Sequence, residues 1–261
     1  MQSRNLIVYT LGFSAAVSIV CAVLVSTAAE LLRDRQEANV EIDRQRNVLM
    51  AAGAVKNAAR LSSEEIERHF TAFTVAAVDL RTGEEDPDFE ITNYDARAAL
   101  ADQSTSRAAP SNNAQIQRIP NYVLVYKQLS DLEKVELIVL PIEGMGLWGT
   151  LYGFLALDSD FTTIQGLTYY EHKETPGLAG EVDNPKWQAL WPDRKAFDAQ
   201  GTPIIAVARG LAGTPQEDPH RVDGLSGATI TSRGITNMLR FWLGEHGYGP
   251  YLKQLKEATN G

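Results

Sequence analysis

Residues 223–231 read DGLSGATIT, and the helix predicted to begin within this stretch decides how the C-terminal part of the chain folds. Apolar side chains recur there at i, i+3, i+4, i+7 and i+8, namely Ile235, Met238, Leu239, Trp242 and Leu243. This spacing gives a helix one apolar face, and the glycines at 244 and 247 end it. We therefore predict a helix over about 228–243 that packs on a core, with the Ser-Gly-Ala-Thr segment at its entrance.

The entrance of this helix is suited to a phosphate group. It offers unpaired N–H groups and the positive end of the helix dipole, and small residues let a phosphate come close. At about 100° per residue, Thr229 shares a face with Arg233 and Arg240, away from the apolar face. Thr231 is about 200° further round, near the core, and Ser226 is expected to cap the helix. The same string also fits an ordinary helix cap, because Ser, Thr and Gly are common at helix starts.

Two further segments are rich in turn residues. Residues 143–149, EGMGLWG, place three glycines where the backbone can turn tightly and approach a ligand. Residues 174–177, ETPG, fit a type II turn with Pro at i+1 and Gly at i+2. Trp148 in the first segment is either an ordinary buried aromatic or a ligand contact.

The remaining pattern predicts strands and short helices. Apolar runs bounded by turn residues predict strands at 73–80, 122–126, 135–140, 150–157 and 204–208. Ser62, with Glu65 three residues later, predicts the start of a capped helix. Residues 84–120 are polar and poor in aliphatics, so we expect an irregular surface excursion. The prediction is an α+β fold in which helices pack on an antiparallel sheet, preceded by one N-terminal transmembrane helix.

The N-terminal run from Asn5 to Ala29 carries no charge. At about 1.5 Å per residue it outreaches a hydrocarbon core of ~30 Å, and it exceeds the ~7–15 apolar residues of a cleaved signal peptide, the alternative. We expect a transmembrane anchor at 1–32, a helical connector at 33–60 and the folded domain at 61–261. Basic residues follow the run at Arg33, Arg35, Arg44 and Arg46. By the positive-inside rule these charges favour a cytoplasmic domain.

Composition excludes several classes of protein. The net charge of -9 over 261 residues argues against nucleic acid as a partner. The single cysteine, Cys21, lies inside the apolar run, and the four histidines are scattered, so no metal site is predicted. No Gly-x-Ser-x-Gly elbow occurs, and we predict no catalytic residues.

Residues 223–229 resemble the flavinylation motif of the FMN-binding domain family, whose members carry FMN as a phosphoester on the last threonine, here Thr229. Residues 171–179, EHKETPGLA, are similar to the family's His-x-Glu-Thr-Pro-Gly-Leu-Gly segment, with Ala179 in place of the last glycine. With the glycine-rich segment 144–149, the N-terminal span and the length, the chain resembles the C-subunit family of sodium-translocating NADH:quinone oxidoreductases over nearly its whole length.

The resemblance implies covalently bound FMN and a set of residues around it. These are Asp223, Gly224, Leu225, Ser226, Gly227, Ala228 and Thr229 in the motif, with Glu174, Thr175, Gly177, Leu178 and Trp148 as flavin walls. It further implies an electron relay between NADH and quinone in a sodium-pumping complex of several subunits, and a flavin transferase during maturation. The family places the domain on the periplasmic side of the bacterial inner membrane, against the charge rule.

Three other functions fit the sequence. One is an FMN carrier like the G-subunit family of the related Rnf electron-transport complex, whose members are usually shorter. Another is a stand-alone flavoprotein reductase with a substrate of its own. The third is a non-redox, membrane-anchored assembly module, in which Thr229 only caps a helix.

Overall fold

The computed structural model describes residues 2–55, 61–92 and 94–260. The chain divides into two compact units, Met1–Arg44 and Gln45–Gly261. The first unit belongs to one long helix, α1 (Gln2–Ala51). Its segment Tyr9–Arg33 is long and apolar enough to cross a membrane, judged by length and composition, and exposes its apolar side chains. The expected connector at 33–60 includes residues 56–60, which lie outside the described residues.

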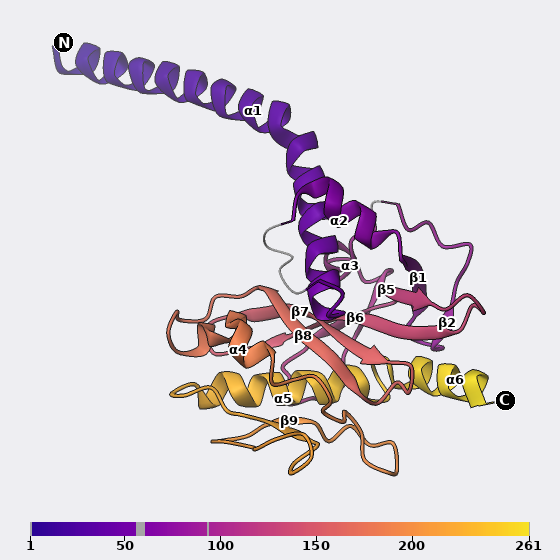
Figure 1. Ribbon diagram of the computed structural model, residues 1–261. Coiled ribbons are helices and arrows are strands. Elements are labelled where there is room, and N and C mark those ends of the chain that lie inside the picture. Colours follow the sequence, from indigo (N-terminus) through magenta and orange to yellow (C-terminus); the bar gives the residue numbers. More distant parts are fainter. Residues whose placement is uncertain (1, 56–60, 93, 261) are drawn as a thin grey trace. The chain divides into compact units, whose positions relative to one another are not determined.

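The second unit is built on a six-stranded antiparallel sheet in the order β2-β1-β5-β6-β7-β8, which confirms the predicted fold class (Figure 1). Its strands are β1 (Phe73–Asp79), β2 (Glu84–Glu85), β5 (Tyr122–Leu129), β6 (Val135–Met145), β7 (Thr150–Asp158) and β8 (Ile164–Glu171). β8 was not predicted from the sequence. Its apolar residues are interrupted by Gln165, Gly166 and Thr168, so no alternating run marks it.

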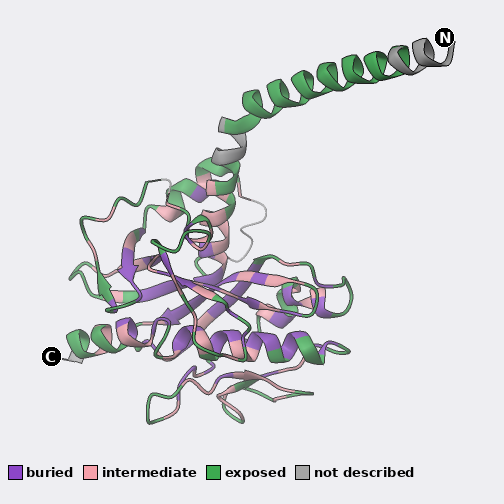
Figure 2. Cartoon of the chain, turned by 180° about the vertical axis from the view of Figure 1, so that it is seen from behind, coloured by how far each residue is buried: buried purple, intermediate pink, exposed green. Residues whose placement is uncertain are grey.

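Helices cover both faces of this sheet (Figure 1). α5 (Thr229–Leu243), within a residue of the predicted helix, and α6 (Gly249–Asn260), which was not predicted, lie on one side. On the other lie α2 (Ser63–Phe70) and the C-terminal end of α1. The capping box at Ser62 is confirmed, since its hydroxyl accepts from the Glu65 N–H while the Glu65 carboxylate accepts from the Ser62 N–H. Burial is concentrated in the sheet and on the α5 face turned to it (Figure 2).

The end of α1 is part of the core of the second unit. Val48, Leu49 and Ala51 are fully buried. A Cβ added to Gly166 on β8 would lie 2.3 Å from the carbonyl oxygen of Ala51, so only glycine allows this close approach. The Thr168 hydroxyl on the same strand donates to the carbonyl oxygen of Asn47 at 3.4 Å.

The expectation of an irregular surface excursion over 84–120 was partly wrong. The segment contains β2, α3 (Ala96–Ala99), β3 (Ser106–Ala108) and β4 (Arg118–Pro120). Although aliphatic residues are few there, Ala114, Ile116 and Ile119 turn inward and join the core. Residues 112–117 therefore return to the body of the domain, where they help to form the site described below.

The segment between β8 and α5 is mostly irregular. The predicted strand at 204–208 is only β9 (Ala206–Val207), which pairs in parallel with β10 (Arg221–Val222). The other short elements are the 3-10 helix η2 (Ala179–Asp183) and α4 (Pro185–Gln188). The β9–β10 pair brings the residues that precede α5 alongside the helix they lead into.

Candidate functional site

The entrance of α5 has no side-chain cap among the described residues. The N-cap residue is Ala228, which has no side-chain oxygen that could accept from the first N–H groups of the helix. The expected cap by Ser226 was wrong, because the chain turns at Gly227 with φ +70°, which leaves Ser226 exposed and two residues before the N-cap. Glycine suits this left-handed backbone. The first N–H groups of α5 therefore remain available to a ligand.

The hydroxyls near this entrance differ in their access to solvent. Thr229 is exposed. Thr231 is fully buried and donates to Oε2 of Glu174 at 2.5 Å, as its predicted place near the core requires. Ser232 is also buried, and its hydroxyl accepts from the N–H of Leu225 at 3.4 Å. Thr229 is therefore the hydroxyl within the first turn of α5 that a ligand can reach.

Glu174 joins the three segments that the sequence singled out. It is 4% exposed. Its Oε1 accepts from the backbone N–H groups of Leu147 and Trp148, both at 2.9 Å, and its Oε2 accepts from Thr231. One buried carboxylate thus ties the glycine-rich turn to the start of α5. A Cβ at Gly146 would lie 2.5 Å from Oε1, so the turn passes too close for any side chain there.

The turn after Glu174 lies beside the α5 entrance. Gly177 has φ +75°, and the N–H of Leu178 donates to the carbonyl oxygen of Thr175 at 3.2 Å, as in the predicted type II turn. Thr175 and Gly177 are exposed. A Cβ on Gly227 would lie 3.2 Å from Cδ2 of Leu178. The turn and the residues before Thr229 are therefore direct neighbours.

Four exposed apolar side chains come from these segments. The exposed fractions are 40% for Leu147, 63% for Trp148, 48% for Leu178 and 53% for Ile230. We call these four residues the apolar patch. Exposed apolar side chains gathered in this way commonly mark a binding surface. Trp148 is not a core residue, so it is not the ordinary buried aromatic that was one of its two alternatives.

An open groove runs beside α5 from this entrance. Its volume is about 570 Å³, and its side-chain lining is Asn113, Gln115, Met145, Ile230, Arg233 and Asn237. We call it the α5 groove. Sequence reasoning missed Asn113 and Gln115, since residues 84–120 gave no pattern that placed them near the helix. The sequence carries no signal that could have identified them, apart from the polar composition of residues 84–120.

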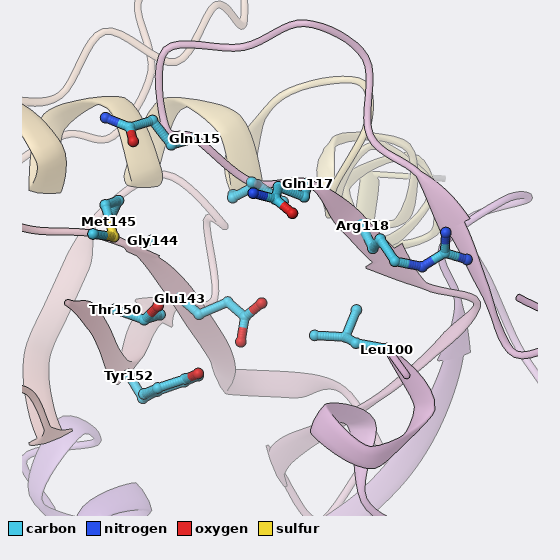
Figure 3. A pocket seen from close by; sticks show the side chains of 10 residues that line it. Leu100, Gln115, Gln117, Arg118, Glu143, Gly144, Met145, Thr150 and Tyr152 are labelled. Atoms are coloured by element: carbon cyan, nitrogen blue, oxygen red, sulfur yellow. The ribbon is translucent and has the colours of Figure 1, made fainter. Parts of the chain in front are cut away.

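A second hollow of about 440 Å³ continues from the groove and shares Gln115 and Met145 with it. Figure 3 shows the Glu143 carboxylate pointing into this hollow, which Tyr152 and Gln117 also line. Burial raises the pKa of the Glu143 carboxyl, and the positive charge of Arg97 opposes that shift.

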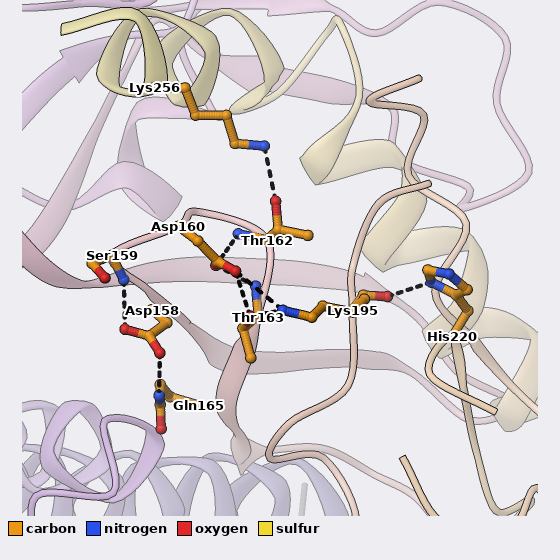
Figure 4. Close-up of polar contacts among 9 residues, drawn as sticks. All are labelled: Asp158, Ser159, Asp160, Thr162, Thr163, Gln165, Lys195, His220 and Lys256. Atoms are coloured by element: carbon orange, nitrogen blue, oxygen red, sulfur yellow. Dashed lines mark hydrogen bonds and ion pairs between the residues drawn. The ribbon is translucent and has the colours of Figure 1, made fainter. Parts of the chain in front are cut away.

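A separate polar cluster fixes the turn between β7 and β8 (Figure 4). Asp160 accepts from the N–H groups of Thr162 and Thr163 and from Lys195, whose Nζ lies 3.1 Å away. Burial alone would raise the pKa of Asp160, but these bonds and the Thr163 hydroxyl outweigh it and hold the pKa at about 2. In residues 2–55, 61–92 and 94–260, no three His, Cys, Asp or Glu side chains gather as a metal site would require.

Comparison with known proteins gives matches across nearly the whole chain. The FMN-binding domain family matches residues 146–244. The C subunit of Na(+)-translocating NADH-quinone reductase from Yersinia pestis is 42% identical over 247 residues, covering 92% of this chain and 90% of that protein. The protein of the same name from Vibrio vulnificus (strain YJ016) is 40% identical over 263 residues, 99% of each chain. The crystal structure of NqrC from Shewanella oneidensis has a TM-score of 0.74 at 35% identity, covering 82% of this chain and 96% of that one.

Proposed function

The chain belongs to the C-subunit family of Na(+)-translocating NADH-quinone reductases, and we propose that it carries FMN covalently on Thr229 and relays electrons within such a complex. The observation that carries this proposal is the exposed hydroxyl of Thr229 at a helix entrance that no side chain caps. In the bound state FMN supplies the redox chemistry, because it takes up electrons in pairs and can release them singly.

The residues at the entrance of α5 fit a phosphoester. The free N–H groups of the first turn and the helix dipole both favour negative charge at this point. Gly227 and Ala228 put no bulky side chain beside Thr229. We expect Asp223, Gly224 and Leu225 to shape the approach, since the N–H of Gly224 donates to Gly210 and the Asp223 carboxylate accepts from Ala212 at 2.7 Å. Ser226 is the exposed rival hydroxyl, on the far side of the turn at Gly227.

The apolar patch fits a flat aromatic ring. Trp148 and Leu178 lie on hydrogen-bonded turns and present exposed apolar surface, as a ring wall requires, and Leu178 lies beside Gly227, two residues before Thr229. Glu174 has both carboxylate oxygens engaged within the protein, so we propose that it positions the walls. Thr175 and Gly177 form the turn that carries Leu178.

We propose that residues 1–32 anchor the chain in the bacterial inner membrane as a single span, that 33–60 connect, and that 61–261 form the FMN-binding domain on the periplasmic side. The apolar helix Tyr9–Arg33 supports the anchor. Arg33, Arg44 and Arg46 follow the span and count against this orientation by the positive-inside rule. A reporter enzyme fused after Gly261 tests it: the proposal predicts activity with a periplasmic reporter and none with a cytoplasmic one, and the reverse would overturn it.

The relay is tested in the assembled complex, with the other subunits and the flavin transferase that we propose as partners. A complex containing Thr229→Ala should assemble with all of its subunits but lose NADH-dependent reduction of quinone. The matched control is Thr259→Ala, an exposed threonine near the C-terminus. Full quinone reduction by a complex in which this chain carries no flavin would contradict the relay.

A further inference from the structure

The outer wall of the α5 groove is a fastened loop, residues 112–117. The side chain of Asn112 bonds twice to Ile116, donating to its carbonyl oxygen at 2.8 Å and accepting from its N–H at 3.1 Å. The loop is also tied to its neighbours. Asn237 on α5 donates to the carbonyl oxygen of Asn113 at 3.0 Å, and the N–H of Met145 at the end of β6 donates to Ala114 at 3.3 Å. The wall is therefore held to both elements that form the rest of the groove.

Gln115 sits in this wall in a left-handed conformation with φ +57°. This backbone is costly for a residue with a Cβ, and it persists only where the surroundings fix it. Its neighbours Ala114 and Ile116 are buried, whereas Gln115 is exposed and lines the groove. The strained backbone thus presents one amide side chain to the groove while both flanking residues enter the core.

Three polar side chains that line the groove have no partner among the residues that the structure describes. Asn113, Gln115 and Arg233 make no side-chain hydrogen bond or ion pair there. Arg240, on the same helix, donates instead to the carbonyl oxygens of Ile204 and Ile205. Arg233 therefore brings an unneutralised positive charge to the groove, and Gln115 brings an amide that can both donate and accept.

Arg233 lies within reach of a group attached to Thr229, and Gln115 lines the same groove as Arg233. Arg233 is four residues along the helix, about 6 Å at ~1.5 Å per residue. Ile230, the residue after Thr229, belongs both to the groove and to the apolar patch. Gly146, another groove residue, directly precedes Leu147 and Trp148. The polar groove and the apolar patch therefore form one surface that begins at Thr229.

We propose that the α5 groove takes the pyrimidine edge of the FMN ring, with Arg233 and Gln115 as the side chains that bind it. The proposal rests on the attachment to Thr229 proposed above. The pyrimidine edge carries two carbonyl oxygens and an N–H, which match the donors of Arg233 and the mixed amide of Gln115. The rest of the ring is apolar and aromatic, and we expect it to contact the apolar patch. Gln115 lies outside residues 146–244, so this wall is supplied by a part of the chain that the FMN-binding domain family does not match.

The charge of Arg233 has a measurable consequence. A guanidinium beside the pyrimidine edge stabilises the negative charge that the ring gains on reduction, and so raises the reduction potential. In the purified full chain carrying FMN, Arg233→Gln should shift the midpoint potential to a lower value. Arg68→Gln is the control. It removes the same charge from an exposed side chain on α2, which lies on the opposite face of the sheet (Figure 1), and it should leave the potential unchanged. Equal potentials for the Arg233 variant and the unmodified chain would overturn the proposal.

A second pair of variants tests the loop without changing charge. Gln115→Gly removes the amide and suits the positive φ, so the loop keeps its shape; it should shift the visible absorption bands of the flavin. Gln117→Ala, which lines only the second hollow, should not shift them. Unchanged bands in Gln115→Gly, or equal shifts in both variants, would contradict the proposal. The intact mass of each chain is measured first. If the chain without substitutions carried no FMN when produced with the transferase, the attachment itself would be refuted. That outcome differs from a chain that carries FMN but whose potential and absorption do not respond to the groove variants.

Discussion

At the scale of single residues, Glu174 has the largest structural role in the site. It is almost fully buried and accepts three hydrogen bonds from two other segments. The resemblance to the FMN-binding family implied a flavin contact, whereas its geometry supports a positioning role. The sequence could not distinguish these roles, because the partners Leu147 and Thr231 are far away along the chain and only the fold brings them together.

Glu174→Ala should destabilise the domain by about 1–3 kcal/mol, because it leaves the buried Thr231 hydroxyl and two N–H groups without an acceptor. Thermal unfolding of the purified chain measures the loss. Glu171→Ala is the control: its carboxylate is exposed and paired with Arg97, so the cost should stay within about 1 kcal/mol. Equal losses for the two variants would show that Glu174 does not tie the segments together.

Asp160 makes stability depend on pH at the β7–β8 turn. Its pKa is lowered from 3.8 to about 2 in the folded state. A depressed carboxyl pKa stabilises the fold above the unfolded value, and this contribution is lost as pH falls from about 4 toward 2. Asp160→Asn should therefore be less stable than the unmodified chain at pH 7, and the difference should shrink over that window. Asp131→Asn, an exposed turn residue, controls for loss of one negative charge. A difference that stays constant down to pH 2 would argue against this account.

At the scale of elements, the contact of α5 with β6 sets the depth of the site. Gly234 is buried on α5, and a Cβ there would lie 2.2 Å from the carbonyl oxygen of Met145. Gly234→Ala should push the helix from the strand, which we expect to cost about 1–3 kcal/mol as overpacking, and should lower FMN loading measured by absorbance. Gly210→Ala meets nothing within 4 Å and should change neither. Normal stability and loading in Gly234→Ala would refute this packing requirement.

The elements predicted well from the sequence are those whose signal lies in a short, continuous stretch of residues. α5 was predicted closely because five apolar residues recur at the helix period and glycines follow. β8 and α6 were missed: β8 is interrupted by polar residues and Gly166, and α6 follows a glycine-rich stretch that was interpreted only as an ending. The attachment motif is a continuous string and could be found. The α5 groove could not, because Gln115 and Arg233 meet only through tertiary structure.

At the scale of the whole molecule, a truncation that keeps the C-terminal end of α1 should differ in stability from one that removes it. Removing residues 1–32 takes away the apolar span and should leave a soluble, folded domain that still accepts FMN. Removing 1–52 also deletes Val48 and Leu49, both fully buried, and each such side chain contributes about 1.5–3 kcal/mol. The longer truncation should therefore unfold at a clearly lower temperature. Two truncated chains of equal stability would show that the α1 end is dispensable to the domain.

The claim on which the account depends is the bond between FMN and Thr229. Its most direct test is peptide mass spectrometry of the chain produced together with a flavin transferase. We predict that the mass of FMN is found on the peptide containing Thr229, that fragmentation places it on that residue, and that Thr229→Ala folds without it. Ser226→Ala, which removes the rival exposed hydroxyl, should leave the flavin on Thr229. Flavin found on Ser226 or Thr231, or retained by the Thr229→Ala chain, would contradict the account.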